Sequence, residues 1–135
     1  MASIFTKIIQ GKIPCEKIAE TDSEIAFLDI NPRSHGHTLC LPKREVTRLE
    51  ELPPKEAASL MGLMQRVAAA VSRAFDGTDY NLTLNNGVNA GQEVLHVHFH
   101  VIPRKPGSSR PFRSREPYGE GEMAAVGARI RSCLD

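Results

Sequence analysis

The sequence predicts an α+β fold in which an antiparallel sheet of about five strands carries one long helix and a C-terminal helix. Short runs rich in apolar and β-branched residues, bounded by Pro, Gly or Asn, recur along the chain and are typical of strands. One stretch with helical periodicity lies between two groups of these runs. This order favours an antiparallel sheet, because a parallel sheet requires strands and helices to alternate.

The first half of the chain is expected to contribute the first group of strands. Residues 3–10 are expected to form a short helical or irregular segment that ends at Gly11. Each strand that follows ends at a turn-forming or proline-containing segment. These strands are expected at Glu16–Thr21, Glu24–Ile30 and His37–Leu41.

The long helix is expected from about Pro54 to Phe75. Pro54 suits the first helical turn, because its missing N–H would have no partner there. Apolar residues recur at helical spacing and predict one buried stripe. The stripe comprises Leu60, Leu63 or Met64, Val67, Val71 and Ala74. Asp76-Gly77 is a stop signal for the helix.

The second half of the chain is expected to add a hairpin and a final helix. Its strands are expected at Tyr80–Leu84 and Val94–Ile102, with an Asn- and Gly-rich loop between them that is typical of functional hairpin loops. From Pro103 to Gly121 the chain is rich in proline, glycine and arginine, which predicts an extended basic loop. The last helix is expected over about Met123 to Leu134.

Composition narrows the class of protein. The chain has 135 residues, of which 41% are hydrophobic and 24% are charged, as in single soluble domains. The formal net charge of +1 argues against a nucleic-acid partner, because nucleic-acid-binding domains are usually strongly basic. We expect no membrane association, because no run approaches about 18 apolar residues and no signal-like start is present. Three cysteines without a C-x-x-C pair favour a reduced, cytoplasmic protein.

Three histidines occupy alternate positions in the last expected strand. Successive side chains of a strand point to opposite faces, so His96, His98 and His100 share one face and the apolar residues between them share the other. A helix would turn these side chains by about 200° from one to the next and would not gather them on one face. The spacing therefore predicts a row of imidazoles ~6.6 Å apart.

Three interpretations of this row are open from the spacing alone. The imidazoles can be solvated polar groups on the open face of an antiparallel sheet. They can be metal ligands, although Glu93 is the only acidic residue nearby in sequence to orient them. They can also include a neutral nucleophile that attacks phosphorus or an acyl carbon, with a neighbouring histidine as proton donor. The middle position makes His98 the natural nucleophile.

These residues, together with others upstream, resemble the histidine triad (HIT) family. The signature H-x-H-x-H followed by two apolar residues stands at 96–102, with Ala90-Gly91-Gln92 before it and Pro103-Arg104 after it. The upstream motifs are Ile4-Phe5-x-Lys7-Ile8-Ile9-x-Gly11-x-Ile13-Pro14, Ala26-Phe27-Leu28-Asp29-Ile30-x-Pro32 and Gly36-His37-Thr38-Leu39-x-Leu41-Pro42-Lys43. The resemblance implies a single HIT domain over 1–135, with its core at about 3–104, the basic loop at 105–121 and the C-terminal helix within 122–135.

The resemblance implies a nucleotide-binding hydrolase that acts at the α-phosphate of nucleoside phosphoramidates or dinucleoside polyphosphates. His98 would form a covalent nucleotidyl intermediate, from which water releases a nucleoside monophosphate such as AMP. His100 would contact the phosphate and leaving group, His96 would orient His98 through its backbone carbonyl, and His37 would hydrogen bond the His96 side chain. The alternatives are a nucleotide-binding regulatory or interaction protein with little turnover, and a metal-dependent hydrolase.

The nucleotide-binding residues are likewise implied by the resemblance. Asp29 corresponds to the acid that binds the ribose hydroxyls, although an Asp before Asn31-Pro32 is also a common turn residue. The base would lie in an apolar slot, whose residues could equally be ordinary core. The slot comprises Phe5, Ile13, Phe27 and Ile30. Asn85, Gly91 and Gln92 would hold the phosphate and ribose, partly through backbone N–H groups.

Two departures from the family pattern affect these expectations. Many bacterial relatives have two cysteines and a histidine that bind zinc where this chain has Ser3, Thr6 and Glu45, so we expect no metal there. Glu93 stands where many members have a small hydroxyl residue, and its charge would repel phosphate. The family also implies a purine nucleotide substrate, a homodimer and no cofactor.

Overall fold

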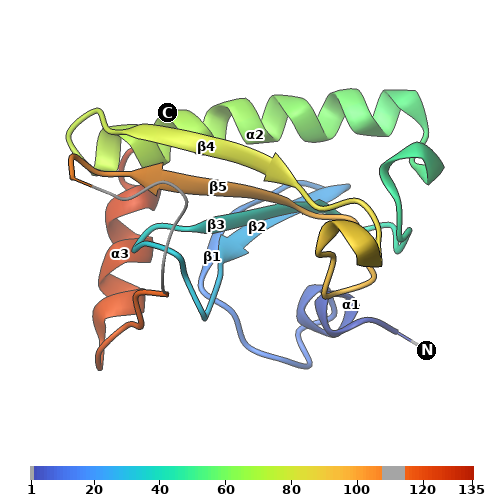
Figure 1. Cartoon of the computed structure of the whole chain (residues 1–135), viewed down its shortest axis with the longest axis horizontal. Coiled ribbons are helices and arrows are strands. Elements are labelled where there is room, and N and C mark those ends of the chain that lie inside the picture. The colour runs from blue at the N-terminus through green and yellow to red at the C-terminus, as the bar shows by residue number, and fades with distance from the viewer. Residues whose placement is uncertain (1, 108–114) are drawn as a thin grey trace.

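The computed structural model describes residues 2–107 and 115–135, and it confirms the predicted α+β fold. Five antiparallel strands form one sheet in the order β1-β2-β3-β5-β4 (Figure 1). The strands are β1 (Lys17–Glu20), β2 (Glu24–Leu28), β3 (Thr38–Pro42), β4 (Asp79–Leu84) and β5 (Phe99–Arg104). Each neighbouring pair is antiparallel, as expected from the order of strands and helices along the chain.

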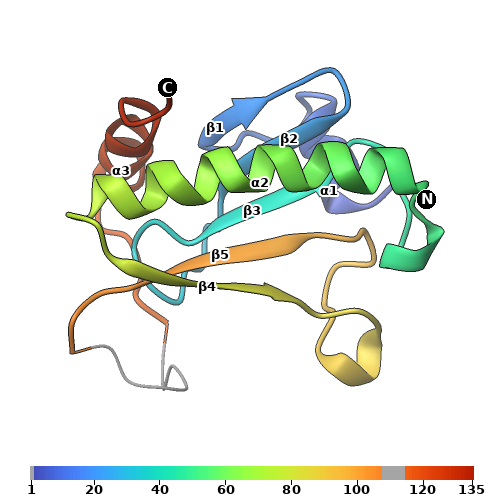
Figure 2. The same ribbon diagram turned by 90° about the horizontal axis from the view of Figure 1, so that it is seen from above.

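The long helix α2 (Pro54–Ala74) runs over one face of this sheet (Figure 2). Its predicted apolar stripe is buried against side chains from the strands, including Ala26, Cys40 and Val101. Burying each large aliphatic side chain of this kind contributes about 1.5–3 kcal/mol to folding. The C-terminal helix α3 (Glu122–Arg131) packs beside α2 and β1, with Ile130 fully buried in the same core.

The short helix α1 (Ile4–Ile9) lies on the opposite side of the sheet (Figure 1). Its Phe5 packs with alternate residues of β2 and β3, including Phe27 and Leu39. Because α1 and α2 cover opposite faces, every residue of β2 and β3 is buried. The sheet is therefore the middle layer, and the side chains that alternate along its central strands serve two different clusters.

β5 is displaced toward the C-terminus relative to the prediction of Val94–Ile102. Residues 94–98 form a loop. The N–H of Val97 in this loop donates a hydrogen bond to Val46 O at 2.8 Å. Pro103 and Arg104 belong to the strand rather than to the basic loop. The pairing of β3 with β5 ends at Val101, so Pro103 pairs on one side only, and proline is tolerated at such edge positions.

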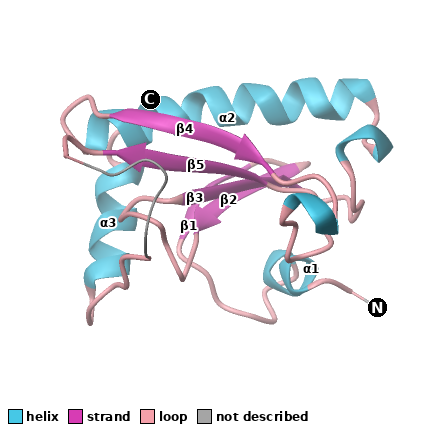
Figure 3. Ribbon diagram, viewed as in Figure 1, coloured by secondary structure: helices cyan, strands magenta, loops and turns pink. Residues whose placement is uncertain are grey.

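The connection between β4 and β5 is long and mostly irregular, with the short 3-10 helix η2 (Val88–Ala90) inside it (Figure 3). A second short 3-10 helix, η1 (Leu49–Glu51), precedes α2. The predicted basic loop lies partly outside the described residues. Among the described residues, no helix is both long and apolar enough to cross a lipid bilayer. The thiols of Cys15, Cys40 and Cys133 are free.

Candidate active site

A cavity of about 530 Å³ lies between α1, the sheet and the loops at the ends of β2 and β4. This volume is in the range of small-molecule binding sites. All predicted site residues except His96 and Gln92 line it. They are Phe5, Ile13, Phe27, Asp29, Ile30, His37, Asn85, Gly91, His98 and His100. The fold thus gathers residues from both ends of the chain around the predicted nucleophile.

His98 has a defined protonation state in this cavity. Its Nδ1 lies 2.7 Å from the backbone oxygen of His96. A carbonyl oxygen can only accept, so Nδ1 carries the proton and Nε2 has the free lone pair. Burial lowers the pKa of His98 below its ordinary value. His98 is therefore bonded to the His96 carbonyl and held as a neutral imidazole with a free Nε2.

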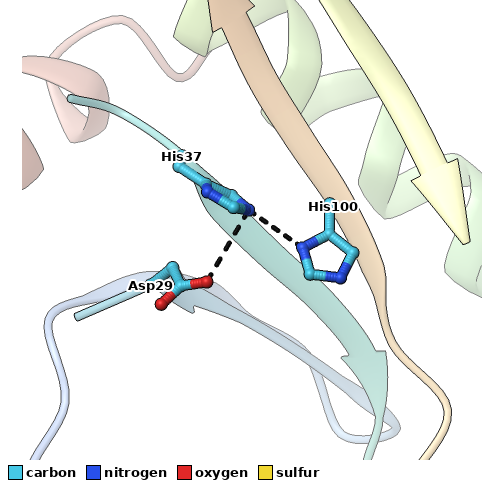
Figure 4. Close-up of side chains that lie close together, drawn as sticks. All are labelled: Asp29, His37 and His100. Atoms are coloured by element: carbon cyan, nitrogen blue, oxygen red, sulfur yellow. Dashed lines mark hydrogen bonds and ion pairs between the residues drawn. The ribbon is translucent and has the colours of Figure 1, made fainter. Parts of the chain in front are cut away.

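His37 and His100 form a hydrogen-bonded pair (Figure 4). The backbone N–H of Arg33 donates to His37 Nδ1 at 3.0 Å, so His37 carries its proton on Nε2. That Nε2 donates to His100 Nδ1 at 2.9 Å, which leaves the His100 proton on Nε2. Burial lowers the pKa of His37 to about 3 and that of His100 to about 4. His100 is thus a neutral donor on the cavity wall.

The expected hydrogen bond between His37 and the His96 side chain is wrong. The register places Leu39 opposite His100, so His37 is the diagonal neighbour of His100 on the same face. His96 lies before β5 begins, beyond the reach of His37. Its ring is fully buried, and its Nε2 donates to Pro42 O at 2.8 Å. The structure therefore assigns His37 to the ring of His100.

The other nitrogen of His96 belongs to a polar cluster at the start of α1. Ser3 Oγ lies 2.9 Å from His96 Nδ1, and it also accepts the N–H of Thr6 as the N-cap of the helix. Glu45 accepts from the backbone N–H of Ser3 at 2.7 Å and from Thr6 Oγ1 at 2.5 Å. The hydrogen bond from Thr6 lowers the pKa of Glu45. Sequence reasoning identified these positions only as a missing zinc site, and it gave them no role.

Asp29 lies beside the histidine pair (Figure 4), and it is one of the residues that line the cavity. Its Oδ1 accepts the N–H of Asn31 at 2.9 Å, and its Oδ2 lies 3.7 Å from His37 Nε2. Burial raises the pKa of Asp29. Ligand atoms of Asp29, His37 and His100 lie within 4.8 Å of one another, so this group could hold a metal ion. A metal on His37 Nε2 would displace the proton that now bonds His100.

Gln92 does not reach the cavity, contrary to the expectation that its side chain holds phosphate. Its Oε1 accepts the N–H of Gly87 at 2.8 Å, and its Nε2 donates to the carbonyls of Thr47 and Val94. The buried side chain satisfies these three backbone groups, which would otherwise lack hydrogen-bond partners. Gln92 therefore braces the loop that carries Gly91, whose φ of 96° is left-handed. Glu93 is exposed and lines the cavity.

Arg33 and Arg115, which were not among the predicted site residues, line the same cavity. Arg33 carries the backbone N–H that bonds His37. Arg115 lies in the predicted basic loop, 15 positions after His100. The abundance of arginine after β5 was the available signal, but it did not indicate which arginine returns to the site.

The chain is similar to known proteins over most of its length. The HIT domain family matches residues 10–107, which include the whole sheet and the three histidines. An adenosine 5′-monophosphoramidase of Schizosaccharomyces pombe is 44% identical over 143 aligned positions, which cover 98% of each chain. An uncharacterized HIT-like protein of Methanocaldococcus jannaschii is 49% identical over 114 residues, which cover 84% of this chain and 87% of that protein.

Among solved structures, a zinc-bound histidine triad family protein from Mycobacterium smegmatis has the same fold. The two structures agree with a TM-score of 0.87 at 33% identity, and the match covers 99% of this chain and 94% of that chain. The long helix, the C-terminal helix and the five-stranded sheet are therefore common to both.

Proposed function

Since this chain belongs to the HIT family, we propose that it is a nucleotide-binding hydrolase that cleaves at the α-phosphate of nucleoside phosphoramidates or dinucleoside polyphosphates. The observation that carries the proposal is the pair of opposite tautomers in one cavity. His98 presents a lone pair on Nε2, and His100 presents a proton on Nε2. A nucleophile and a proton donor side by side are the groups that displacement at phosphorus requires.

The first step forms a bond between His98 Nε2 and the α-phosphorus as the bond to the leaving group breaks. The leaving group takes the proton from His100 Nε2, which leaves His100 as an imidazolate that accepts the hydrogen bond of His37 Nε2 until the second step returns the proton. The imidazolium formed at His98 keeps its Nδ1 proton, which the His96 carbonyl stabilises. In the second step, water gives its proton back to His100 Nε2 and attacks phosphorus. The bond to His98 then breaks, which releases the nucleoside monophosphate and restores both rings.

The rest of the cavity suits a purine nucleotide. Phe5, Ile13, Phe27 and Ile30 form its apolar part, which would hold the base. Asp29 would accept hydrogen bonds from the ribose hydroxyls, because a carboxylate has acceptor sites for both. Asn85 and the Gly91 loop would contact the phosphate, with Gln92 as the brace of that loop. AMP is the product that this assignment predicts, and the adenosine phosphoramidase relative supports it.

A substrate panel with intermediate trapping tests the proposal. The protein is incubated with adenosine 5′-phosphoramidate and with diadenosine polyphosphates, and AMP release is measured. When the substrate carries a labelled adenylyl group, rapid quenching without acid should leave the label on His98. Peptide mapping then identifies the labelled residue. Absence of AMP release from every substrate would overturn hydrolase function. Turnover with label on no histidine would overturn the covalent route.

Two other candidate functions rest on specific features of the cavity. Exposed Glu93 would repel phosphate and slow turnover, which favours a nucleotide-binding regulatory protein. AMP binding without turnover of any substrate would support that function. The group of Asp29, His37 and His100 is the feature that favours a metal-dependent hydrolase. Activity that a chelator removes and zinc restores would support it.

We further propose that residues 1–135 act as one HIT domain that forms a homodimer through β4. This strand is at the edge of the sheet, and its residues are exposed except for the half-exposed Leu84. Tyr80 and Leu82 add apolar surface to that edge. Light scattering coupled to size exclusion should report a dimer, and Leu82→Lys should shift it toward the monomer. A monomer at all concentrations would contradict the assignment.

A further inference from the structure

The chain that follows the basic loop returns to the cavity. Glu116 donates its N–H to Pro32 O at 2.8 Å, and its Oε1 accepts the N–H of His35 at 2.8 Å. The ring of Tyr118 stacks on His35 with centroids 4.4 Å apart, and its hydroxyl accepts the N–H of Gly36 at 3.0 Å. Arg115 is therefore held against the loop between β2 and β3 by the residues that follow it.

Two arginines line the cavity from this region, and the charges of both act on His37 and His100. Arg115 hydrogen bonds the carbonyl of Asn31 through Nη1 and lines the cavity. Arg33 also lines it, and the Arg33 backbone bonds His37 directly. Within residues 2–107 and 115–135, neither guanidinium forms an ion pair with a carboxylate. Two unpaired cations in a cavity are a ready site for an anionic group of a ligand.

The cations act on one end of the row of histidines. Burial and then the neighbouring histidine lower the pKa values of His37 and His100 most, and the charges of Arg115 and Arg33 lower them further. Burial lowers the pKa of His98 as well, and the charges of Asp29 and Glu93 offset only part of that effect. The arginine charges therefore act on the His37–His100 pair, beside which Asp29 also lies, with its Oδ2 3.7 Å from His37 Nε2. A leaving group that takes its proton from His100 would emerge on the side of the cavity where the charges of Arg33 and Arg115 act.

We propose that Arg33 and Arg115 form a subsite for an anionic leaving group, specifically the phosphates beyond the α-phosphate of a dinucleoside polyphosphate. The inference rests on the proposed function, because a leaving group is defined only by attack at the α-phosphorus. Guanidinium groups match phosphate oxygens with paired N–H donors, and their charge offsets that of the departing polyphosphate. A phosphoramidate with a neutral amine leaving group has no partner for either arginine. The pair therefore sets the preference between the two substrate classes.

The test compares one substrate of each class in matched variants. The kcat/KM values for diadenosine tetraphosphate and adenosine 5′-phosphoramidate are measured in wild type, Arg33→Gln, Arg115→Gln and the double variant. Arg66→Gln removes a charge from the exposed face of α2 and serves as the control. The ratio of the two kcat/KM values should fall about tenfold in each single variant and about 100-fold in the double variant, in favour of the phosphoramidate. Arg66→Gln should keep the wild-type ratio.

Binding gives a second readout that does not depend on turnover. In a His98→Ala background, affinities for AMP and ATP are measured by calorimetry, with and without Arg33→Gln and Arg115→Gln. The advantage of ATP over AMP should disappear in the arginine variants. An unchanged ratio in both experiments, or equal losses for both ligands, would overturn the subsite while leaving the proposed function intact. Failure of every protein to bind AMP would overturn the proposed function itself, and the subsite with it.

Discussion

The hydroxyl of Ser3 lies 2.9 Å from Nδ1 of His96, although 93 positions separate the two residues in the chain. Ser3 also caps α1, whose Phe5 packs edge-on against the His98 ring at a centroid distance of 4.9 Å. Ser3 therefore holds in place both the ring of His96 and the helix α1, which lines the cavity. Since the His96 carbonyl orients His98, Ser3 is a positioning residue for the nucleophile.

Replacing Ser3 by alanine should reduce both stability and activity. The variant loses the helix cap and leaves His96 Nδ1 buried without its partner, so we expect the free energy of unfolding to fall by about 1–3 kcal/mol. Loss of an orienting contact of this kind should lower kcat/KM by about tenfold. Ser3→Thr keeps the hydroxyl and should restore both. Urea denaturation, steady-state kinetics and the ¹⁵N shifts of the His96 and His98 rings measure these effects; wild-type kcat/KM in Ser3→Ala would contradict the positioning role.

His98→Ala should abolish turnover and keep nucleotide binding. The variant removes the attacking nitrogen, and losses of at least about 10⁴-fold in kcat are usual when a nucleophile is deleted. AMP affinity should stay within about threefold of wild type, because binding relies on the other cavity residues. Calorimetry with AMP and a discontinuous assay for AMP release measure the two effects. Retained turnover would show that another group attacks phosphorus.

The acid limb of kcat/KM should lie below pH 6.5, the ordinary pKa of histidine. Attack requires neutral His98, and burial lowers the pKa of His98, so the ring stays neutral into more acidic solution than a free imidazole would. His37 and His100, with pKa values of about 3 and about 4, stay neutral across the same range. A pH profile of kcat/KM for adenosine 5′-phosphoramidate measures the limb, and a midpoint above 6.5 would contradict the burial of the nucleophile.

The same shifts predict that the folded state loses stability on acidification. In the unfolded chain His37 and His100 take up protons as the pH falls through about 6.5, whereas in the folded protein they do so only at pH values of about 3 and about 4. The unfolded state therefore binds more protons than the folded state between these limits. As a result, the free energy of unfolding decreases as the pH is lowered through this window. The raised pKa of Asp29 opposes this trend at its acidic end. Urea unfolding at pH 7.5, 6 and 5 measures the slope.

Chelation should leave the protein unchanged. The cluster of Ser3, Thr6, Glu45 and His96 is satisfied by its own hydrogen bonds, and it contains no thiolate for a tetrahedral zinc site. Dialysis against EDTA should alter neither Tm nor kcat/KM, and added zinc should increase neither. Loss of activity that zinc restores would instead identify Asp29, His37 and His100 as ligands.

Gly36→Ala should destabilise the fold and disturb the adjacent His37. Gly36 has a φ of +98°, and a Cβ there would lie 2.5 Å from a ring carbon of Phe75 at the end of α2. We expect a loss of about 1–3 kcal/mol from the strain and the collision together. Gly77→Ala is the control, because Gly77 has a φ of +77° with no atom within 4 Å of such a Cβ. If both variants lose equal stability, the contact with Phe75 contributes nothing.

Local patterns predicted most of the elements and many of the residues that line the cavity. Helical spacing located α2 to within one residue, since its stripe faces a continuous core. Alternation along 96–100 placed His98 and His100 together on one face. The start of β5 was wrong, because the alternating pattern continues into a loop that lacks strand partners.

Tertiary hydrogen bonds were not predictable from these patterns. Whether His37 meets His96 or His100 depends on the register between β3 and β5, which no single strand encodes. Arg115 lies at the cavity because Glu116 and Tyr118 form hydrogen bonds with the loop after β2. Gln92 was misassigned because an amide that can hold phosphate can equally satisfy buried backbone groups.

The exposed edge at β4 also has a consequence for handling the protein. Its backbone groups and the side chains of Tyr80 and Leu82 form a template on which strands of other molecules can add, and no lysine or proline interrupts it. Any association that covers this edge also protects against aggregation. Dilution or mild denaturation that uncovers it should therefore cause precipitation before the core unfolds, and a charged residue at position 82 should improve solubility under those conditions.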